Sequence, residues 1–155
     1  MPSYVTYHIF AATVQRVTSD SVAHIASSYP AAYRWGSQGP DPLALYHAPF
    51  PSALRRLANR VCTEPPAPLF ESLCKAAVAS HNTAALAYVF GFCTHYALSR
   101  VTCSFVSAQA DRLSQFMPGY SAEARRHLVE SDIDGVMIPA TPKRIRPRVK
   151  LITKR

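Results

Sequence analysis

Apolar residues recur at intervals of three and four along most of this chain, and few stretches alternate with the two-residue period of a strand. Most of the 13 prolines cluster at 40–51, at 65–68 and after 139, and they separate these helical stretches. The pattern predicts an all-α fold, a compact multi-helix bundle with one long loop. Helices are predicted over residues 3–16, 19–28, 51–62, 67–80, 82–103, 107–116 and 121–138.

Short polar residues indicate where several of these helices begin. Ser19, Asn82 and Ser121 each precede a helical stretch and can cap it, because a short polar side chain can accept a hydrogen bond from the first free amides. The segment Trp35–Pro42 is predicted to be a loop, since prolines flank Asp41 and glycines precede it. We expect one helical domain over residues 1–138 and a basic, proline-containing tail over 139–155.

Composition narrows the class of protein. The chain has 155 residues, of which 48% are hydrophobic and 17% are charged, as in a globular domain rather than a disordered one. No apolar run reaches the roughly 18 residues that a membrane span requires, so no transmembrane segment is expected. The first residues contain neither a basic segment nor an apolar one, so no signal peptide is expected and a cytoplasmic location is predicted.

The net charge of +8 is concentrated at the end of the chain. Residues 143–155 contain seven basic residues and no acid, which leaves the rest nearly neutral. Three interpretations stay open: a solvated tail, an arm that binds phosphate on an anionic membrane surface or on nucleic acid, or a segment that packs or forms a short strand. The candidate anion-binding residues are Lys143, Arg144, Arg146 and Arg148.

One apolar helical stretch carries a row of polar side chains. His95, Ser99 and Cys103 follow one another at intervals of four, which places them on one face of a helix. A second stretch carries His127, Glu130 and Asp134 at related spacings. These residue types can bind a metal, although a core histidine and buried thiols would give the same pattern.

Five segments, taken together and in order, resemble the bacterial zinc-dependent phospholipase C family, which is related to the P1-type nucleases. The resemblance extends from Met1 to about Ile138. The segments are Met1–Ala11 (MPSYVTYHIFA), Gln38–Pro42 (QGPDP), Asn59–Pro65 (NRVCTEP), Gly91–Leu98 (GFCTHYAL) and His127–Asp134 (HLVESDID).

The resemblance implies a helical bundle that holds up to three zinc ions and hydrolyses a phosphodiester with a metal-activated water. It implies a phospholipid or another phosphodiester as the substrate. Three ligand positions of the family match this chain, namely Asp41, His95 and Glu130, and Asp41 is also the candidate catalytic residue.

Other ligand positions of the family differ here. Cys62 and Cys103 stand where the family has histidine, and a thiolate is still a zinc ligand. Ser99 stands where the family has aspartate, and it loses a negative charge. The candidate metal ligands are therefore Asp41, Cys62, His95, Cys103 and Glu130.

Two further histidines are displaced by one residue. Tyr7 and Arg126 occupy positions where the family has histidine, and His8 and His127 follow them. One residue on a helix is a rotation of about 100°, so His8 and His127 are expected to point away from the other ligands. They remain additional candidates, together with Ser99. With this altered set, fewer than three zinc ions, or none, are expected.

Three interpretations remain open. The first is a zinc-dependent phosphodiesterase of the phospholipase C type, weakened by its altered ligands. The second is a non-catalytic relative that binds anionic lipid or nucleic acid, in which Arg126 pairs with Glu130 in place of the metal. The third is a P1-type nuclease, for which aromatic residues near Asp41 could stack on bases, namely Tyr29, Tyr33, Trp35 and Phe50.

Overall fold

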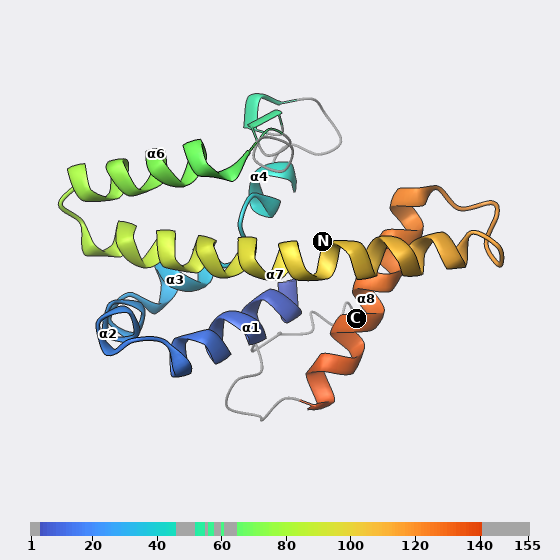
Figure 1. Cartoon of the computed structure of the whole chain (residues 1–155), viewed down its shortest axis with the longest axis horizontal. Helices are drawn as coiled ribbons and strands as arrows, with labels where there is room; N and C mark the ends of the chain where they lie inside the picture. The colour runs from blue at the N-terminus through green and yellow to red at the C-terminus, as the bar shows by residue number, and fades with distance from the viewer. Residues whose placement is uncertain (1–3, 46–51, 55, 58–59, 61–64, 141–155) are drawn as a thin grey trace, which may run out of the picture. The chain divides into compact units, whose positions relative to one another are not determined.

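The computed structural model describes residues 4–45, 52–54, 56–57, 60 and 65–140 (Figure 1). Within these residues the fold consists of helices and contains no strand, which confirms the predicted all-α class. No described helix is both long enough and apolar enough to cross a membrane. The helices are α1 (Tyr4–Val17), α2 (Asp20–Ser28), α3 (Pro30–Gly36), α4 (Asp41–Leu45), α6 (Pro66–Ala79), α7 (Thr83–Leu113) and α8 (Ala122–Ala140).

Several predicted boundaries are confirmed by the caps that form there. The Asn82 side chain accepts a hydrogen bond from the Ala84 amide at 2.9 Å, and Ser121 Oγ accepts one from the Ala124 amide at 3.1 Å. These bonds satisfy amides in the first turns of α7 and α8. Ser19 precedes α2 but makes no such side-chain bond.

Three predicted elements are wrong. The helices expected over 82–103 and 107–116 form one helix, α7, because no proline or glycine interrupts the chain between Phe92 and Met117. The loop expected over Trp35–Pro42 is shorter, since α3 continues to Gly36 and α4 begins at Asp41. Pro30 starts α3 at a position where proline's missing amide hydrogen costs nothing. Half of the helix expected over 51–62 lies outside the described residues, and within it residues 53–54, 56–57 and 60 are helical.

The chain divides into two compact units, and each is described by itself. One unit contains residues 14–97 and the other contains residues 1–13 and 98–155. The predicted division between a domain over 1–138 and a tail over 139–155 concerns a stretch that lies mostly outside the described residues.

In the unit of residues 14–97, α6 lies along the first half of α7 (Figure 1). The Phe70 ring makes T-shaped contacts with the rings of Phe92 and Tyr96, at centroid distances of 5.8 and 5.3 Å. Such aromatic pairs contribute beyond the apolar area that they bury. On another side of α7, α3 approaches so closely that its backbone touches the backbone of α7.

This close approach depends on two glycines. A β-carbon on Gly91 of α7 would overlap the Tyr33 carbonyl oxygen of α3, and a β-carbon on Gly36 would overlap the Tyr88 carbonyl oxygen. Both obstacles are backbone atoms, which cannot rotate away. The glycines therefore fix the distance between α3 and α7.

In the other unit, α8 packs on the second half of α7 around Val106, Ala110 and Val129. Asp134 of α8 is buried and joins this helix to the start of α1. Its carboxylate accepts hydrogen bonds from the Val5 amide at 3.3 Å, from the Thr6 amide at 2.9 Å and from the Thr6 hydroxyl at 2.5 Å. A side chain distant in sequence thus caps α1 and places a negative charge at its amino end.

Replacing Gly91 by alanine should destabilise the protein by about 2–3 kcal/mol, because α3 and α7 must separate. Gly135 is the matched control, since it also lies inside a helix but a β-carbon there would meet open space. Gly135→Ala should instead be stabilising by about 0.5–1 kcal/mol. Urea denaturation of both variants measures the difference, and equal stabilities would contradict the close approach.

Replacing Asp134 by alanine should lower the free energy of unfolding by about 1.5–3 kcal/mol, because three hydrogen bonds to a charged group are lost. Asp111→Ala removes an exposed carboxylate of α7 and should change stability by no more than about 0.5 kcal/mol. Thermal and chemical denaturation provide the comparison. A variant lacking Asp134 that is as stable as the Asp111 control would refute the capping role.

Candidate functional site

The strongest candidate site surrounds His95, in the unit of residues 14–97. His95 lies on α7 and is only 3% exposed. Its Nδ1 atom is 3.3 Å from the carbonyl oxygen of Ser37, in the turn between α3 and α4. A carbonyl only accepts hydrogen bonds, so Nδ1 carries the proton when the ring is neutral, and the lone pair lies on Nε2.

The charge state of His95 follows from its burial. Removal from water penalises the imidazolium form and lowers the pKa of His95 from 6.5 to about 4, despite the opposing effect of the Ser37 carbonyl. The ring is therefore neutral at physiological pH. A neutral imidazole, oriented by a backbone carbonyl on one nitrogen and with a lone pair on the other, has the form in which histidine binds metals.

The turn beside His95 is shaped by Gly39. This residue has φ +58°, and a β-carbon there would overlap the His95 ring. Glycine is needed both for the left-handed backbone and for the contact with the ring. The Gly39 amide donates to the Gly36 carbonyl at 2.8 Å, which closes the turn. Ser37 and Gln38 are buried with it.

Asp41 follows this turn as the first residue of α4. Burial raises the pKa of its carboxyl group from 3.8 to about 6. Asp41 is therefore largely ionised at neutral pH, although less completely than an ordinary aspartate. The structure thus places two of the predicted ligands, His95 and Asp41, in one compact unit, with the turn that contacts His95 leading into Asp41.

The other unit contains the predicted ligand Glu130, which is only 4% exposed. Its Oε2 atom is 3.2 Å from Nδ1 of His127, one turn earlier on α8. His127 was expected to point away from the other ligands, and that expectation is wrong for Glu130. Positions i and i+3 are neighbours on a helix, so the two side chains meet without any rotation of α8.

Two of the positions where the sequence resemblance predicts metal ligands form a hydrogen bond with each other. The hydroxyl groups of Tyr7 and Ser99 are 2.6 Å apart, and Tyr7 is buried. His8, the next residue, is half-buried, and its ring stacks on Tyr4 at a centroid distance of 6.3 Å. Tyr7 and Ser99 thus satisfy one another's polar groups.

Cys103 is exposed and free, so the alternative of a buried thiol is wrong for this residue. The guanidinium of Arg126 lies 3.9 Å from its sulfur atom. The proposed pairing of Arg126 with Glu130 is also wrong, since Arg126 contacts Cys103 and Glu130 contacts His127. A cation beside the sulfur opposes the binding of a metal ion there.

Some predicted site residues lie outside the described part of the chain. They are Cys62, Lys143, Arg144, Arg146 and Arg148. Within the described part, no group of three or more histidine, cysteine, aspartate or glutamate residues is positioned to hold a metal ion. Of the aromatic residues considered for stacking on bases, Trp35 and Tyr29 are 60% and 40% exposed, whereas Tyr33 is buried. Phe50 lies outside the described residues.

The sequence did not indicate the roles of Ser37 and Thr94. The contribution of Ser37 is a backbone carbonyl, which has no side-chain signature. Thr94 is buried beside His95, and its hydroxyl donates to the Gly91 carbonyl at 2.7 Å. Gly39 alone had a detectable signal, because a glycine before proline in a short connection is typical of a turn.

Comparison with known proteins found no match: no family model, no curated protein and no solved structure is similar to this chain.

Protonation of His95 and of Asp41 should affect stability in opposite directions. The pKa of His95 is near 4 in the folded chain and 6.5 in the unfolded chain, so between these pH values the unfolded chain binds the extra proton. The contribution of His95 to stability therefore rises with pH across this window. The pKa of Asp41 is near 6 when folded and 3.8 otherwise, so the folded chain binds the extra proton. The contribution of Asp41 therefore falls as pH rises from about 4 to 6.

The variants should separate these two effects. Between about pH 4 and 6, the free energy of unfolding of Asp41→Asn should rise with pH more steeply than that of wild type. The free energy of unfolding of His95→Gln should fall with rising pH over the same range. Chemical denaturation at several pH values measures both, with the exposed His24→Gln as the control. Identical pH dependence in the two variants would contradict the assigned burial.

Proposed function

We propose that this chain binds a zinc ion through His95 and Asp41 and acts as a phosphodiester hydrolase of the phospholipase C type, weakened by its altered ligands. The observation that carries the proposal is the neutral, buried His95, whose Nδ1 is held by the Ser37 carbonyl. This arrangement supports a ligand role because it determines which nitrogen keeps its lone pair.

The chemical types of His95 and Asp41 fit zinc, which binds imidazole nitrogen and carboxylate oxygen. Bound zinc would supply Lewis acidity toward a phosphoryl oxygen and an acidified water. His95 would offer Nε2 without first losing a proton, whereas Asp41, with its pKa near 6, would bind metal more weakly in acid. Cys62 is a proposed additional ligand on the basis of the sequence.

The substrate class rests on the resemblance of the five sequence segments. A phospholipid is proposed first, and a single-stranded nucleic acid is the alternative from the related nucleases. The exposed Trp35 precedes the turn that contacts His95 and could contact either a lipid surface or a base. The basic tail would favour both substrates, since both carry phosphates.

A specific observation favours a second function, that of a non-catalytic relative. The Tyr7–Ser99 hydrogen bond and the Arg126–Cys103 contact occupy four positions where the resemblance requires metal ligands. Side chains that satisfy one another do not need a metal for stability. Such a protein would keep the helical scaffold and bind anionic lipid or nucleic acid.

Zinc binding is the first test. Purified full-length protein should contain about one zinc per chain by elemental analysis, and His95→Gln should weaken zinc binding by about 100-fold or more in calorimetric titration. His24→Gln is the control, because His24 is exposed on α2. Changing Cys62 and Cys103 together to alanine tests whether the thiols contribute.

Hydrolysis is then measured with the zinc-loaded protein on phosphatidylcholine vesicles and on single-stranded DNA. Release of a phosphorylated head group that depends on His95 would support the hydrolase. Absence of zinc after incubation with excess metal would refute it and favour the non-catalytic alternative, for which vesicle sedimentation measures lipid binding.

A further inference from the structure

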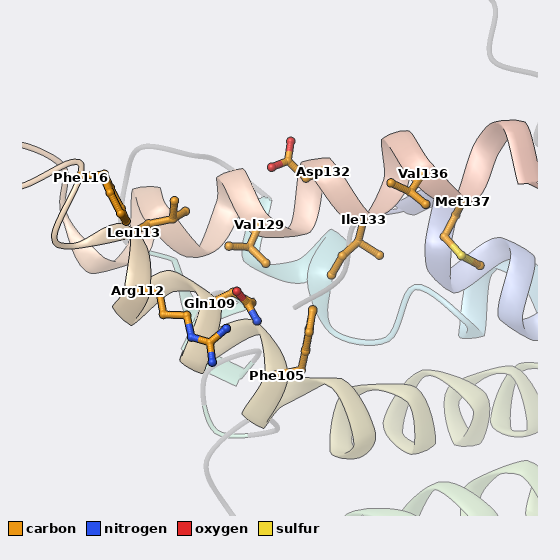
Figure 2. Close-up of a pocket in the computed structure, with 10 residues that line it drawn as sticks. All are labelled: Phe105, Gln109, Arg112, Leu113, Phe116, Val129, Asp132, Ile133, Val136 and Met137. Atoms are coloured by element: carbon orange, nitrogen blue, oxygen red, sulfur yellow. The ribbon is translucent and has the colours of Figure 1, made fainter.

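A second surface of interest lies in the other unit, on the side of α7 and α8 shown in Figure 2. The end of α7, the turn after it and the second half of α8 form a groove of about 560 Å³. Its floor includes Leu113, Val129 and Ile133, which belong to or pack on the small core between these helices. The candidate site around His95 contributes no residue to this groove.

Large apolar side chains around the groove are open to solvent. Phe105 of α7 is 53% exposed, Phe116 in the turn after α7 is 79% exposed, and Val136 of α8 is 68% exposed. They line the groove along both helices (Figure 2). Contiguous apolar surface of this kind is typical of sites where another molecule binds. A small ligand would leave much of so open a surface in water, which favours a macromolecular partner.

The charges at the edges indicate which partner fits. Arg112 lies on the α7 side of the groove and Asp132 on the α8 side, and both are exposed (Figure 2). Neither makes an ion pair with another residue in the part of the chain that the structure describes. The groove therefore has an apolar floor with one positive edge and one negative edge.

We propose that this groove is the interface of a homodimer, in which a second copy of the chain binds face to face. A two-fold axis that runs along the groove places α8 of each copy opposite α7 of the other. Arg112 then meets Asp132 of the partner subunit, and the same pair forms again by symmetry. The surface is self-complementary, whereas an anionic membrane or nucleic acid would face the carboxylate of Asp132.

Burial of the apolar side chains supplies the attraction, and the two ion pairs select the relative orientation of the copies. The aromatic rings of Phe105 and Phe116 are suited to this role, since large aromatic side chains contribute much of the energy at the centres of interfaces. The inference does not depend on zinc binding or on hydrolysis.

Sedimentation velocity of the full chain, in reducing buffer to prevent disulfide formation, should show dimers that dissociate on dilution. Val136→Asp should shift the equilibrium to monomer, because it would bury a carboxylate in an apolar interface. Val78→Asp is the matched control, since Val78 of α6 is similarly exposed, at 65%, but lies outside the groove. Circular dichroism confirms that each variant keeps its helices.

The charge pairs provide a sharper test. Arg112→Glu and Asp132→Arg should each raise the dimer Kd about tenfold or more, because each creates two pairs of like charges. The double variant Arg112→Glu/Asp132→Arg should restore the wild-type Kd, since the pairs form again with reversed signs. Monomeric wild-type protein at all concentrations, or a double variant that stays as weak as the single ones, would overturn the proposal.

Discussion

The backbone contact between α3 and α7 is the constraint on which the candidate site depends. Gly36 and Gly91 let the two helices touch without intervening side chains, so the turn that follows α3 lies directly against α7. The Ser37 carbonyl consequently reaches the His95 ring, and Gly39 packs on that ring. Larger residues at the crossing would move this turn, and the tautomer of His95 would lose its backbone partner.

Burial then determines the chemistry of the site. His95 is neutral because water is excluded, and Asp41 retains its proton to higher pH for the same reason. Both effects favour the uncharged form, although Asp41, with its pKa near 6, is still largely ionised at neutral pH. Glu130 is similarly buried, but His127 beside it supplies a nitrogen at 3.2 Å. Comparable polar groups are thus accommodated differently in the two units.

Two features stabilise the second unit: the hydrogen-bonded carboxylate of Asp134, and a row of apolar residues between α7 and α8 that we call the seam. Asp134 binds the amides at the start of α1, so α8 is joined to a segment more than 120 residues away by hydrogen bonds rather than by packing alone. Val106, Ala110 and Val129 form the seam between α7 and α8. The seam is narrow, and Phe105, Phe116 and Val136 beside it stay exposed, which gives this unit an apolar surface available for association.

The sequence by itself determined the helical class and the starts of α7 and α8, because apolar periodicity and capping by Asn82 and Ser121 are local effects. It also identified His95 and Asp41 as candidates. Only the tertiary structure decided that Ser37 orients His95, that Asp134 caps α1 and that Cys103 is exposed. These features depend on groups distant in sequence, often on backbone atoms, and a backbone carbonyl or amide leaves no residue-specific pattern in the sequence.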